Sequence, residues 1–209
     1  MSEKSAVVKQ GPDIACVAGI LVGGGSTRMG RPKATLPMPH GRTMIEHVAG
    51  AVTRAGPWIS EWVILGQGPE LPAALAGVRV LRDGVCGAGP LAGLIRLLEY
   101  AGSRWGLLLA CDLPLLEPGL LNRLGSAAGA DCDAVAFRCS GRPDRWHACC
   151  ALYHPRLLEP AVAELRDGGR SLNRLLAASR LRSLNAGPRQ ERQLMNLNTP
   201  DDYERLLDP

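Results

Sequence analysis

Residues 105–110 read Trp-Gly-Leu-Leu-Leu-Ala and lead directly into Cys111 and Asp112. A strand with one face in solvent alternates apolar and polar residues, whereas a strand covered on both faces reads as a continuous apolar run. Strands of the second kind belong mainly to parallel sheets with helices packed on both sides. This run therefore predicts an α/β fold, and it places the carboxylate of Asp112 at the end of a buried strand.

Apolar runs of strand length alternate with helix-like stretches along the rest of the chain. We expect strands at residues 14–22, 62–65, 78–81, 105–110, 134–137 and 149–153, and helices at residues 44–55, 90–100, 118–128, 155–166, 171–179 and 200–207. Strands that alternate with helices are typical of a doubly wound sheet. The predicted fold class is α/β, with one mostly parallel, Rossmann-like sheet.

Length and composition exclude several other classes of protein. The chain has 209 residues, 46% of them hydrophobic and 21% charged, so it can bury a core and is not expected to be disordered. The 24 Lys and Arg residues against 20 Asp and Glu form no basic block, which argues against nucleic acid as a partner. No apolar run approaches the ~20 residues of a membrane helix, and no secretory signal opens the chain. We expect a cytoplasmic protein without membrane contact, with residues 1–13 as a flexible tail and residues 14–209 as one domain.

The seven cysteines form no C-x-x-C pair, which together with the expected location indicates reduced thiols. A zinc site could be imagined from a group of cysteines and histidines in the second half of the chain. Its members would be Cys132, Cys139, His147, Cys149, Cys150 and His154. Zinc ribbons and fingers space their ligands as C-x₂₋₄-C, and this group does not, so we disfavour a zinc site.

A glycine-rich segment follows the first expected strand, and residues 21–33 read Leu-Val-Gly-Gly-Gly-Ser-Thr-Arg-Met-Gly-Arg-Pro-Lys. Glycines have no Cβ, so the backbone N–H groups of such a loop can approach a phosphate chain closely. Arg28 and Lys33 add positive charge to the same loop. Because ligands of open α/β sheets bind at the carboxyl ends of the strands, we interpret this segment as a phosphate-binding loop.

The two common phosphate-binding motifs do not fit this segment. A P-loop requires Lys-Ser/Thr after its last glycine, where Arg31 and Pro32 stand here. The dinucleotide motif G-x-G-x-x-G fails because Arg28 occupies the position of its last glycine. An ordinary glycine-rich turn is the alternative, and the two cations directly after a buried strand argue against it.

The pattern L-x-G-G-x-S-x-R-M-G-x-x-K resembles the nucleotidyltransferases that include molybdenum cofactor guanylyltransferase, with Val22 where alanine is usual. The resemblance implies a nucleotidyltransferase fold like that of nucleotide-diphospho-sugar transferases. In this family the loop wraps the triphosphate, and the position that matches Lys33 contacts the phosphates. The nucleotide-binding residues implied are Leu21, Val22, Gly23, Gly24, Gly25, Ser26, Lys33, Asp83 and Asp112, and the catalytic residues implied are Lys33, Arg28 and Asp112.

Asp112 stands in the sequence Cys-Asp-Leu-Pro, at the end of the buried strand. A carboxylate in this position can hold Mg²⁺ through one or two oxygens, although Asp also serves in simple turns. The matching C-D-x-P motif of the family supplies a Mg²⁺ ligand. The resemblance therefore implies that Asp112 is the metal ligand and Mg²⁺ the cofactor.

Residues 83–93 resemble a second motif of the family, D-x₅-G-P-L-A-G. The pair Gly89-Pro90 begins a helix, and a helix N-terminus favours a phosphate or a base carbonyl, although the glycines could simply shape the cap. In the family the aspartate of this motif lies in the nucleotide pocket. The resemblance implies that Asp83 helps to recognise guanine or ribose.

Two stretches of the second half also match the family. His147 opens a stretch similar to H/Q-P-L-x-A-L-Y, with Ala148 in place of proline. If the resemblance is set aside, we interpret His147 and His154 as surface or packing residues rather than as ligands. Residues 196–203 match N-x-N-T-P-E/D-D/E-[LY]. A helix cap explains Thr199, Pro200 and Asp202, but it leaves Asn196 and Asn198 on one side of an extended segment. The resemblance implies that both asparagines bind the acceptor.

These motifs lead to one main hypothesis, the transfer of GMP from GTP to molybdopterin phosphate with release of pyrophosphate. The alternatives are a related transferase that uses CTP or GTP with another phosphorylated acceptor, and a nucleotide-binding protein without catalysis. We expect a monomer or weak oligomer that contacts molybdoenzymes or other cofactor-synthesis proteins transiently. The chain has 21 arginines and three lysines, and its only lysine after residue 9 is Lys33. A compact ammonium at this position suits contact with phosphate oxygens.

Overall fold

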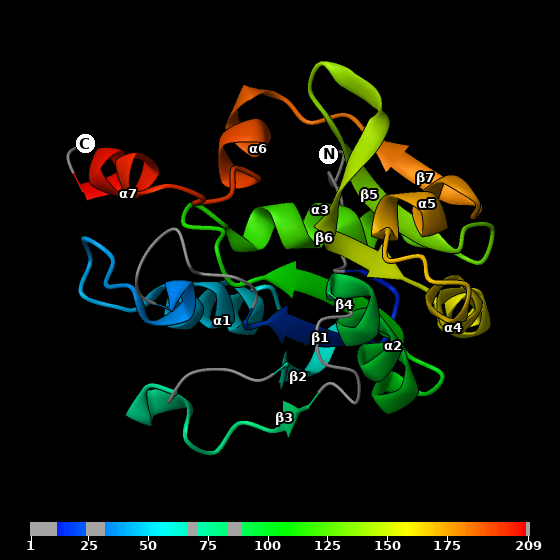
Figure 1. Ribbon diagram of the computed structural model, residues 1–209, viewed down its shortest axis with the longest axis horizontal. Coiled ribbons are helices and arrows are strands. Elements are labelled where there is room, and N and C mark those ends of the chain that lie inside the picture. The colour runs from blue at the N-terminus through cyan, green and yellow to red at the C-terminus, as the bar shows by residue number, and fades with distance from the viewer. Residues whose placement is uncertain (1–11, 24–31, 67–70, 83–88, 208–209) are drawn as a thin grey trace, which may run out of the picture.

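One seven-stranded sheet forms the centre of the computed structural model, which describes residues 12–23, 32–66, 71–82 and 89–207 (Figure 1). Its strands follow the spatial order β3-β2-β1-β4-β6-β5-β7. Their bounds are Cys16–Leu21 for β1, Ile59–Leu65 for β2, Val80–Leu81 for β3, Trp105–Ala110 for β4, Ala134–Cys139 for β5, Arg142–Tyr153 for β6 and Leu181–Leu184 for β7.

Most neighbouring strands of this sheet are parallel. β1 pairs in parallel with β2 and β4, β2 with β3, and β5 with β7, whereas β6 runs antiparallel to both β4 and β5. The prediction of an α/β fold with a mostly parallel sheet is therefore confirmed. Since β1 and β4 are parallel neighbours, the residues that follow them emerge side by side at one edge of the sheet.

Helices cover both faces of the sheet. The α-helices are α1 Met44–Arg54, α2 Pro90–Ala101, α3 Pro118–Ala127, α4 Leu158–Arg166, α5 Leu172–Ala177, α6 Pro188–Gln193 and α7 Pro200–Leu207, and the short 3₁₀ turns are η2 Lys33–Thr35, η3 Ala73–Leu75 and η4 Pro155–Leu157. Helices α2, α3 and α6 begin with proline, whose missing N–H has no partner in a first turn anyway. At α1, the backbone N–H of Thr43 donates to Glu46 at 2.7 Å.

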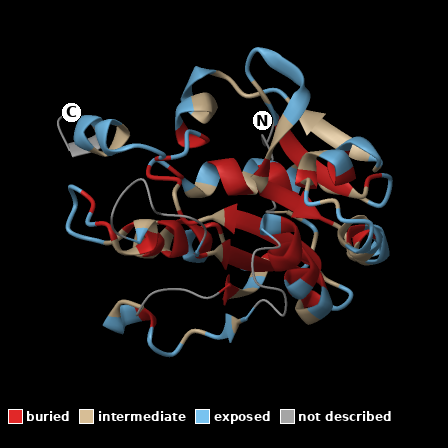
Figure 2. Ribbon diagram, in the orientation of Figure 1, coloured by how far each residue is buried: buried red, intermediate tan, exposed pale blue. Residues whose placement is uncertain are grey.

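The core lies on both faces of the central strands (Figure 2). Leu107 and Leu109 of β4 pack into a cluster with residues of α1 and α3, and Leu108 between them packs into a second cluster with α2, α4 and α5. All three leucines are fully buried. This is the arrangement that the uninterrupted apolar run of β4 predicts.

Gly19 in the middle of β1 permits the close approach of neighbouring side chains. A Cβ at this position would lie 2.5 Å from Cδ1 of Leu65 and 3.0 Å from Cδ1 of Leu97. Both leucines are fully buried and have little room to move. The glycine is thus required by packing, although a glycine inside a strand otherwise weakens it.

The sequence-based boundaries fail in the second half of the sheet. The strand expected at residues 149–153 is β6, which begins at Arg142 because it forms a hairpin with β5 around Ser140 and Gly141. Its polar first half carries no alternation that could predict a strand. Strand β7 and helix α6 were also not expected, since β7 is short and pairs only with β5 at the sheet edge. None of the helices in the described residues is long and apolar enough to cross a membrane.

The packing of Gly19 gives a prediction on stability. Gly19→Ala should lower the free energy of unfolding by about 1–3 kcal/mol, because the new methyl group overpacks the core. Urea unfolding followed by circular dichroism measures the change. Gly77→Ala is the matched control, since a Cβ at Gly77 would meet nothing within 4 Å, and it should change the value by less than about 0.5 kcal/mol. Equal stability of the two variants would contradict the packing argument.

Candidate active site

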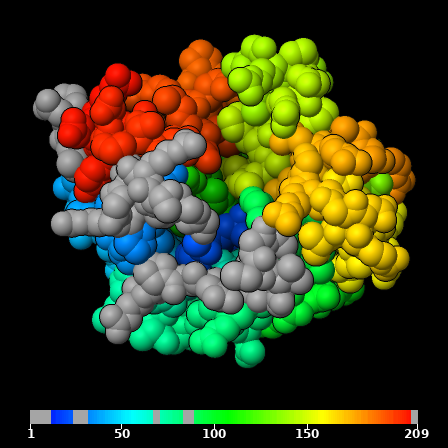
Figure 3. All heavy atoms as spheres, in the orientation of Figure 1, coloured from blue at the N-terminus to red at the C-terminus, as the bar shows by residue number. Residues whose placement is uncertain are grey.

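The predicted site residues that the structure describes gather at the carboxyl edge of β1 and β4. Leu21 is the last residue of β1, Val22 and Gly23 follow it, and Asp112 lies two residues beyond β4. Figure 3 shows dark blue atoms of the β1 region in a hollow near the middle of this face, with the orange and red C-terminal segment higher on the same face. Five predicted residues lie outside the described ranges, namely Gly24, Gly25, Ser26, Arg28 and Asp83.

Lys33 contacts two other predicted residues. Its Nζ donates to Oδ2 of Asp112 at 2.9 Å and to Oδ1 of Asn198 at 3.2 Å. The side chains of Lys33 and Asp112 are only 20% and 13% exposed, so their attraction is less screened than that of a surface pair. Three segments that are distant in the sequence thus meet at one ammonium group.

Sheet hydrogen bonds fix the segments on either side of Asp112. The N–H of Cys111 donates to the carbonyl of Leu21 at 3.2 Å, and the N–H of Val22 donates to the carbonyl of Leu65 at 2.9 Å. Gly23 then adopts φ +98°, which is the left-handed region that glycine tolerates. Val22 and Gly23 therefore leave the sheet next to the backbone of Cys111, the residue before Asp112.

The C-terminal segment is docked against the same edge by its backbone and by apolar contacts. The N–H of Leu197 donates to the carbonyl of Asp112 at 3.0 Å, and the Leu197 side chain is buried with Leu36, Met38 and Met44. Because Leu197 points inward, Asn196 and Asn198 on either side of it remain exposed. Tyr203 completes the docking, since its hydroxyl donates to the carbonyl of Pro37 at 2.6 Å.

The cap of α7 also positions Asn198. Oδ2 of Asp202 accepts the N–H of Asn198 at 3.0 Å and the N–H of Thr199 at 2.9 Å, and Oγ1 of Thr199 accepts the N–H of Asp202 at 3.1 Å. The predicted helix cap is confirmed, and it reaches one residue further than expected. Backbone hydrogen bonding, first of all from Asn198, lowers the pKa of the Asp202 carboxyl.

The glycines of the G-P-L-A-G motif have structural roles at this edge. Gly89 adopts φ +69° as the residue before α2. A Cβ on Gly93 would lie 2.5 Å from Cδ2 of Leu21, so glycine allows α2 to approach the end of β1. A structural role therefore explains both glycines: Gly89 forms the cap of α2, and Gly93 lets the helix pack closely against β1.

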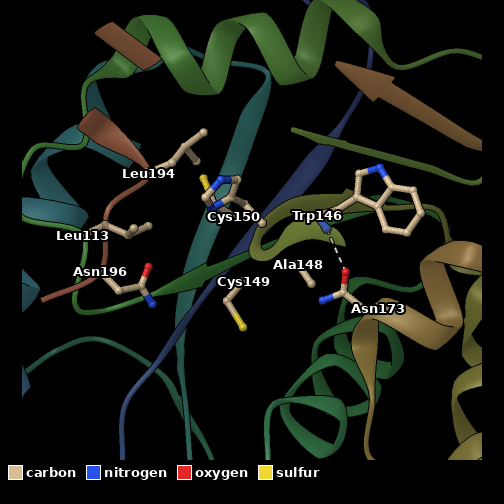
Figure 4. A pocket seen from close by; sticks show the side chains of 9 residues that line it. Leu113, Trp146, Ala148, Cys149, Cys150, Asn173, Leu194 and Asn196 are labelled. Carbon is tan, nitrogen blue, oxygen red and sulfur yellow. Dashed lines mark hydrogen bonds between the residues drawn. The ribbon is translucent and has the colours of Figure 1, made fainter. Parts of the chain in front are cut away.

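A pocket of about 250 Å³ lies against β6, the neighbour of β4 on the side away from β1 (Figure 4). It is lined by Leu113, Trp146, His147, Ala148, Cys149, Cys150, Asn173, Leu194 and Asn196. Only Asn196 was predicted as a site residue. No local sequence pattern singled out Asn173 or Trp146. Asn173 lies on the short helix α5, and Trp146 lies in the first half of β6, which was not predicted as a strand.

Burial disfavours the charged forms of the titratable groups in this pocket. Burial lowers the pKa of His147, whose Nε2 is buried without a partner in the part of the chain that the structure describes. Burial, followed by the charge of Asp112, raises the pKa of the Cys149 thiol to about 12, and burial also raises the pKa of Cys150 to about 12. Together with Cys16, Cys111, Cys132 and Cys139, these cysteines are free thiols.

The fold is shared with solved nucleotidyltransferases. Molybdopterin-guanine dinucleotide biosynthesis protein A from Archaeoglobus fulgidus is similar with a TM-score of 0.72 at 22% identity, covering 92% of this chain and 97% of that chain. The 2-C-methyl-D-erythritol 4-phosphate cytidylyltransferase from Thermus thermophilus is similar with a TM-score of 0.64 at 20% identity. The match covers 93% of this chain and 97% of that chain. The fold is therefore that of the α/β nucleotidyltransferases.

The sequence comparisons define the family within this class. Residues 18–184 match the MobA-like NTP transferase domain, and the chain belongs to this family. The probable molybdenum cofactor guanylyltransferase of Mycobacterium avium (strain 104) is 35% identical over 191 residues, covering 90% of this chain and 92% of the relative. The chain is a nucleotidyltransferase, and the family that its motifs indicated is confirmed.

The Asp202 cap gives a prediction on pH. Its lowered pKa means that the carboxylate keeps its charge, and the cap its hydrogen bonds, until the pH falls below the usual range of an aspartate. In an NMR titration, the amide protons of Asn198 and Thr199 should therefore shift together as the pH falls through this lowered pKa. Asp202→Asn should abolish the common shift, whereas Asp201→Asn, a change at the neighbouring exposed carboxylate, should leave it. Persistence of the shift in Asp202→Asn would show that another group causes it.

Proposed function

We propose that this protein is a molybdenum cofactor guanylyltransferase, which transfers GMP from GTP to molybdopterin phosphate and releases pyrophosphate. The observation that carries the proposal is the contact of Lys33 with both Asp112 and Asn198, at 2.9 and 3.2 Å. It joins the end of the glycine-rich segment, the end of β4 and the C-terminal segment at one point. The name and the coverage of the Mycobacterium avium relative support the choice of substrates.

The order of the strands supports a separation of the two substrates around Asp112. β4 lies between β1 and β6, so Val22 and Gly23 after β1 are on one side of β4 and the β6 pocket is on the other. We assign GTP to the β1 side and the acceptor to the side of Asn196 and Asn198. The reacting phosphates then meet near Lys33, which belongs to neither side alone.

Lys33 acts in this proposal by binding phosphate oxygens. An ammonium has three donors, of which the contacts with Asp112 and Asn198 use two, and it is compact enough to reach between phosphate groups. Positive charge that is already in position stabilises the charge that develops during phosphoryl transfer. Arg28 and the amides of Gly24, Gly25 and Ser26 contribute to the same task in our proposal.

The acceptor needs no general base. A phosphate monoester has a second pKa near ~6, so it is mostly dianionic at neutral pH and is already a nucleophile. The residues of the site therefore have to position two anions and reduce their repulsion. Asn196 and Asn198 suit the positioning of the acceptor because amides donate and accept hydrogen bonds without adding charge.

The donor set at Asp112 fits a divalent cation that binds together with a triphosphate. Among the described residues, no group of three or more His, Cys, Asp or Glu side chains could hold a metal by itself. Mg²⁺ is commonly bound through one or two carboxylates, with phosphates and water as the other ligands. We therefore propose Asp112 as the protein ligand of Mg²⁺. When bound, the cation neutralises charge on the phosphates of the nucleotide.

The alternatives from the sequence differ in base and acceptor. The fold alone does not separate GTP from CTP, since a cytidylyltransferase shares it. Asp83 is our candidate for guanine or ribose recognition and lies outside the described residues. Transient contact with molybdoenzymes or cofactor-synthesis proteins, a monomeric or weakly associated state and a cytoplasmic location are further proposals from the sequence.

The proposed reaction is tested by pyrophosphate release with each of the four NTPs, with and without molybdopterin. Release should require GTP and molybdopterin together, and it should stop when a chelator removes divalent metal and resume when Mg²⁺ is added. Release with CTP and another phosphorylated acceptor would establish the related transferase instead. Binding of GTP without release in any mixture would favour the non-catalytic alternative.

The role of Lys33 gives a separate prediction. Lys33→Ala should reduce kcat by about 10²–10³-fold, because it removes a charge that stabilises the transferring phosphates. The melting temperature should change little in comparison. Arg96→Ala removes a cation from the exposed face of α2 and serves as the control with normal turnover. Turnover of Lys33→Ala within a few-fold of the native protein would refute the role assigned to this lysine.

A further inference from the structure

The pocket against β6 owes its shape to an irregularity in the pairing of β5 and β6. Ala136 of β5 pairs with Ala151 and Arg138 pairs with Trp146, so one residue of β5 faces residues 147–150 of β6. All four of these β6 residues line the pocket. A bulge of this kind bends a strand and re-aims its side chains, and bulges are frequent beside active sites.

The bulge begins where the pairing of β6 with β4 ends. The last pair between these strands is Leu109 with Cys150, and Asp112 follows shortly after Leu109. The charge of Asp112 contributes to the raised pKa of Cys149, which agrees with the closeness of the pocket to this carboxylate. A ligand in the pocket therefore lies next to the site of phosphoryl transfer.

Asn173 and Ser183 hold Trp146 at two points. The backbone N–H of Trp146 donates to Oδ1 of Asn173 at 2.8 Å, and its indole Nε1 donates to Oγ of Ser183 at 2.9 Å. Figure 4 shows the first of these bonds and places the amide nitrogen of Asn173 on the side of Cys149. The pocket is thus fixed before a ligand binds, which lowers the entropic cost of binding.

The chemistry of the lining selects an uncharged ligand. None of the nine lining residues is Asp, Glu, Lys or Arg, and burial disfavours the charged forms of the histidine and the two thiols. The side-chain amides of Asn173 and Asn196 lie on opposite sides of Ala148 and Cys149 in Figure 4. Apolar walls with a few polar groups are typical of sites for flat organic ligands.

We infer that this pocket binds the uncharged heterocyclic ring of the acceptor, and that Asn173 determines specificity by donating from Nδ2 to a carbonyl or nitrogen acceptor on that ring. The inference rests on the proposed function, because it assigns the ring to the same acceptor whose phosphate lies near Lys33. Asn173 has two tasks, since its oxygen anchors the bulge and its nitrogen contacts the ligand. Under molybdopterin as acceptor, the ring is the pterin.

Asn173→Asp separates the two tasks of this residue. The carboxylate can still accept the N–H of Trp146, but it has no donor for the ring and it brings a negative charge. We expect the KM for molybdopterin to rise about tenfold or more, whereas the KM for GTP, the kcat at saturation and the melting temperature stay near native values. Asn185→Asp is the matched control, because it makes the same change at an exposed asparagine outside the pocket.

A binding measurement distinguishes this inference from the proposed reaction. Unsubstituted pterin, which has no phosphate, should bind the native protein in a fluorescence titration without GTP, and it should bind Asn173→Asp at least about tenfold more weakly. Failure of GMP transfer with normal pterin binding would overturn the reaction and leave the pocket assignment standing. An unchanged KM for molybdopterin in Asn173→Asp, or no binding of pterin to the native protein, would overturn the assignment.

Discussion

The position of β4 between β1 and β6 is the constraint on which the site depends. Parallel pairing with β1 aligns Leu21 with Ala110, so the glycine-rich segment and Asp112 leave the sheet together. Antiparallel pairing with β6 brings the bulge to the other side of the same carboxylate. Because β4 is buried on both faces, neither neighbour can shift without exposing apolar side chains to water.

The contact of Lys33 with Asp112 and Asn198 follows from this framework and from the docking of the C-terminal segment. Leu197 is buried against Leu36, Met38 and Met44, which are close in sequence to Lys33. Burial of this apolar group therefore brings Asn198 to the lysine, and the cap of α7 holds its backbone there. Apolar packing determines where the polar groups of the site meet.

The two sides of the site differ in their charge. Arg28, the cation predicted for the β1 side, and Lys33 between the two sides suit a polyanion, whereas the β6 pocket has no formally charged side chain. An acceptor with one phosphate and a neutral ring would match both sides at once. Its phosphate would lie at the lysine and its ring in the pocket, which agrees with the substrates that we propose.

The sequence by itself determined the α/β class, the two-sided burial of β4 and the cap at Thr199, because these depend on local composition and spacing. It also predicted roles for Lys33 and Asp112 through the resemblance of its motifs. The family was also readable from its motifs, and the comparisons confirmed it. Only the tertiary structure decided that Lys33 meets Asn198, which is 165 residues away, and that Asn173 anchors a bulge in β6. These contacts depend on the register of the strands and on the burial of Leu197. The local sequence alone does not determine which strands pair or which residues Leu197 packs against.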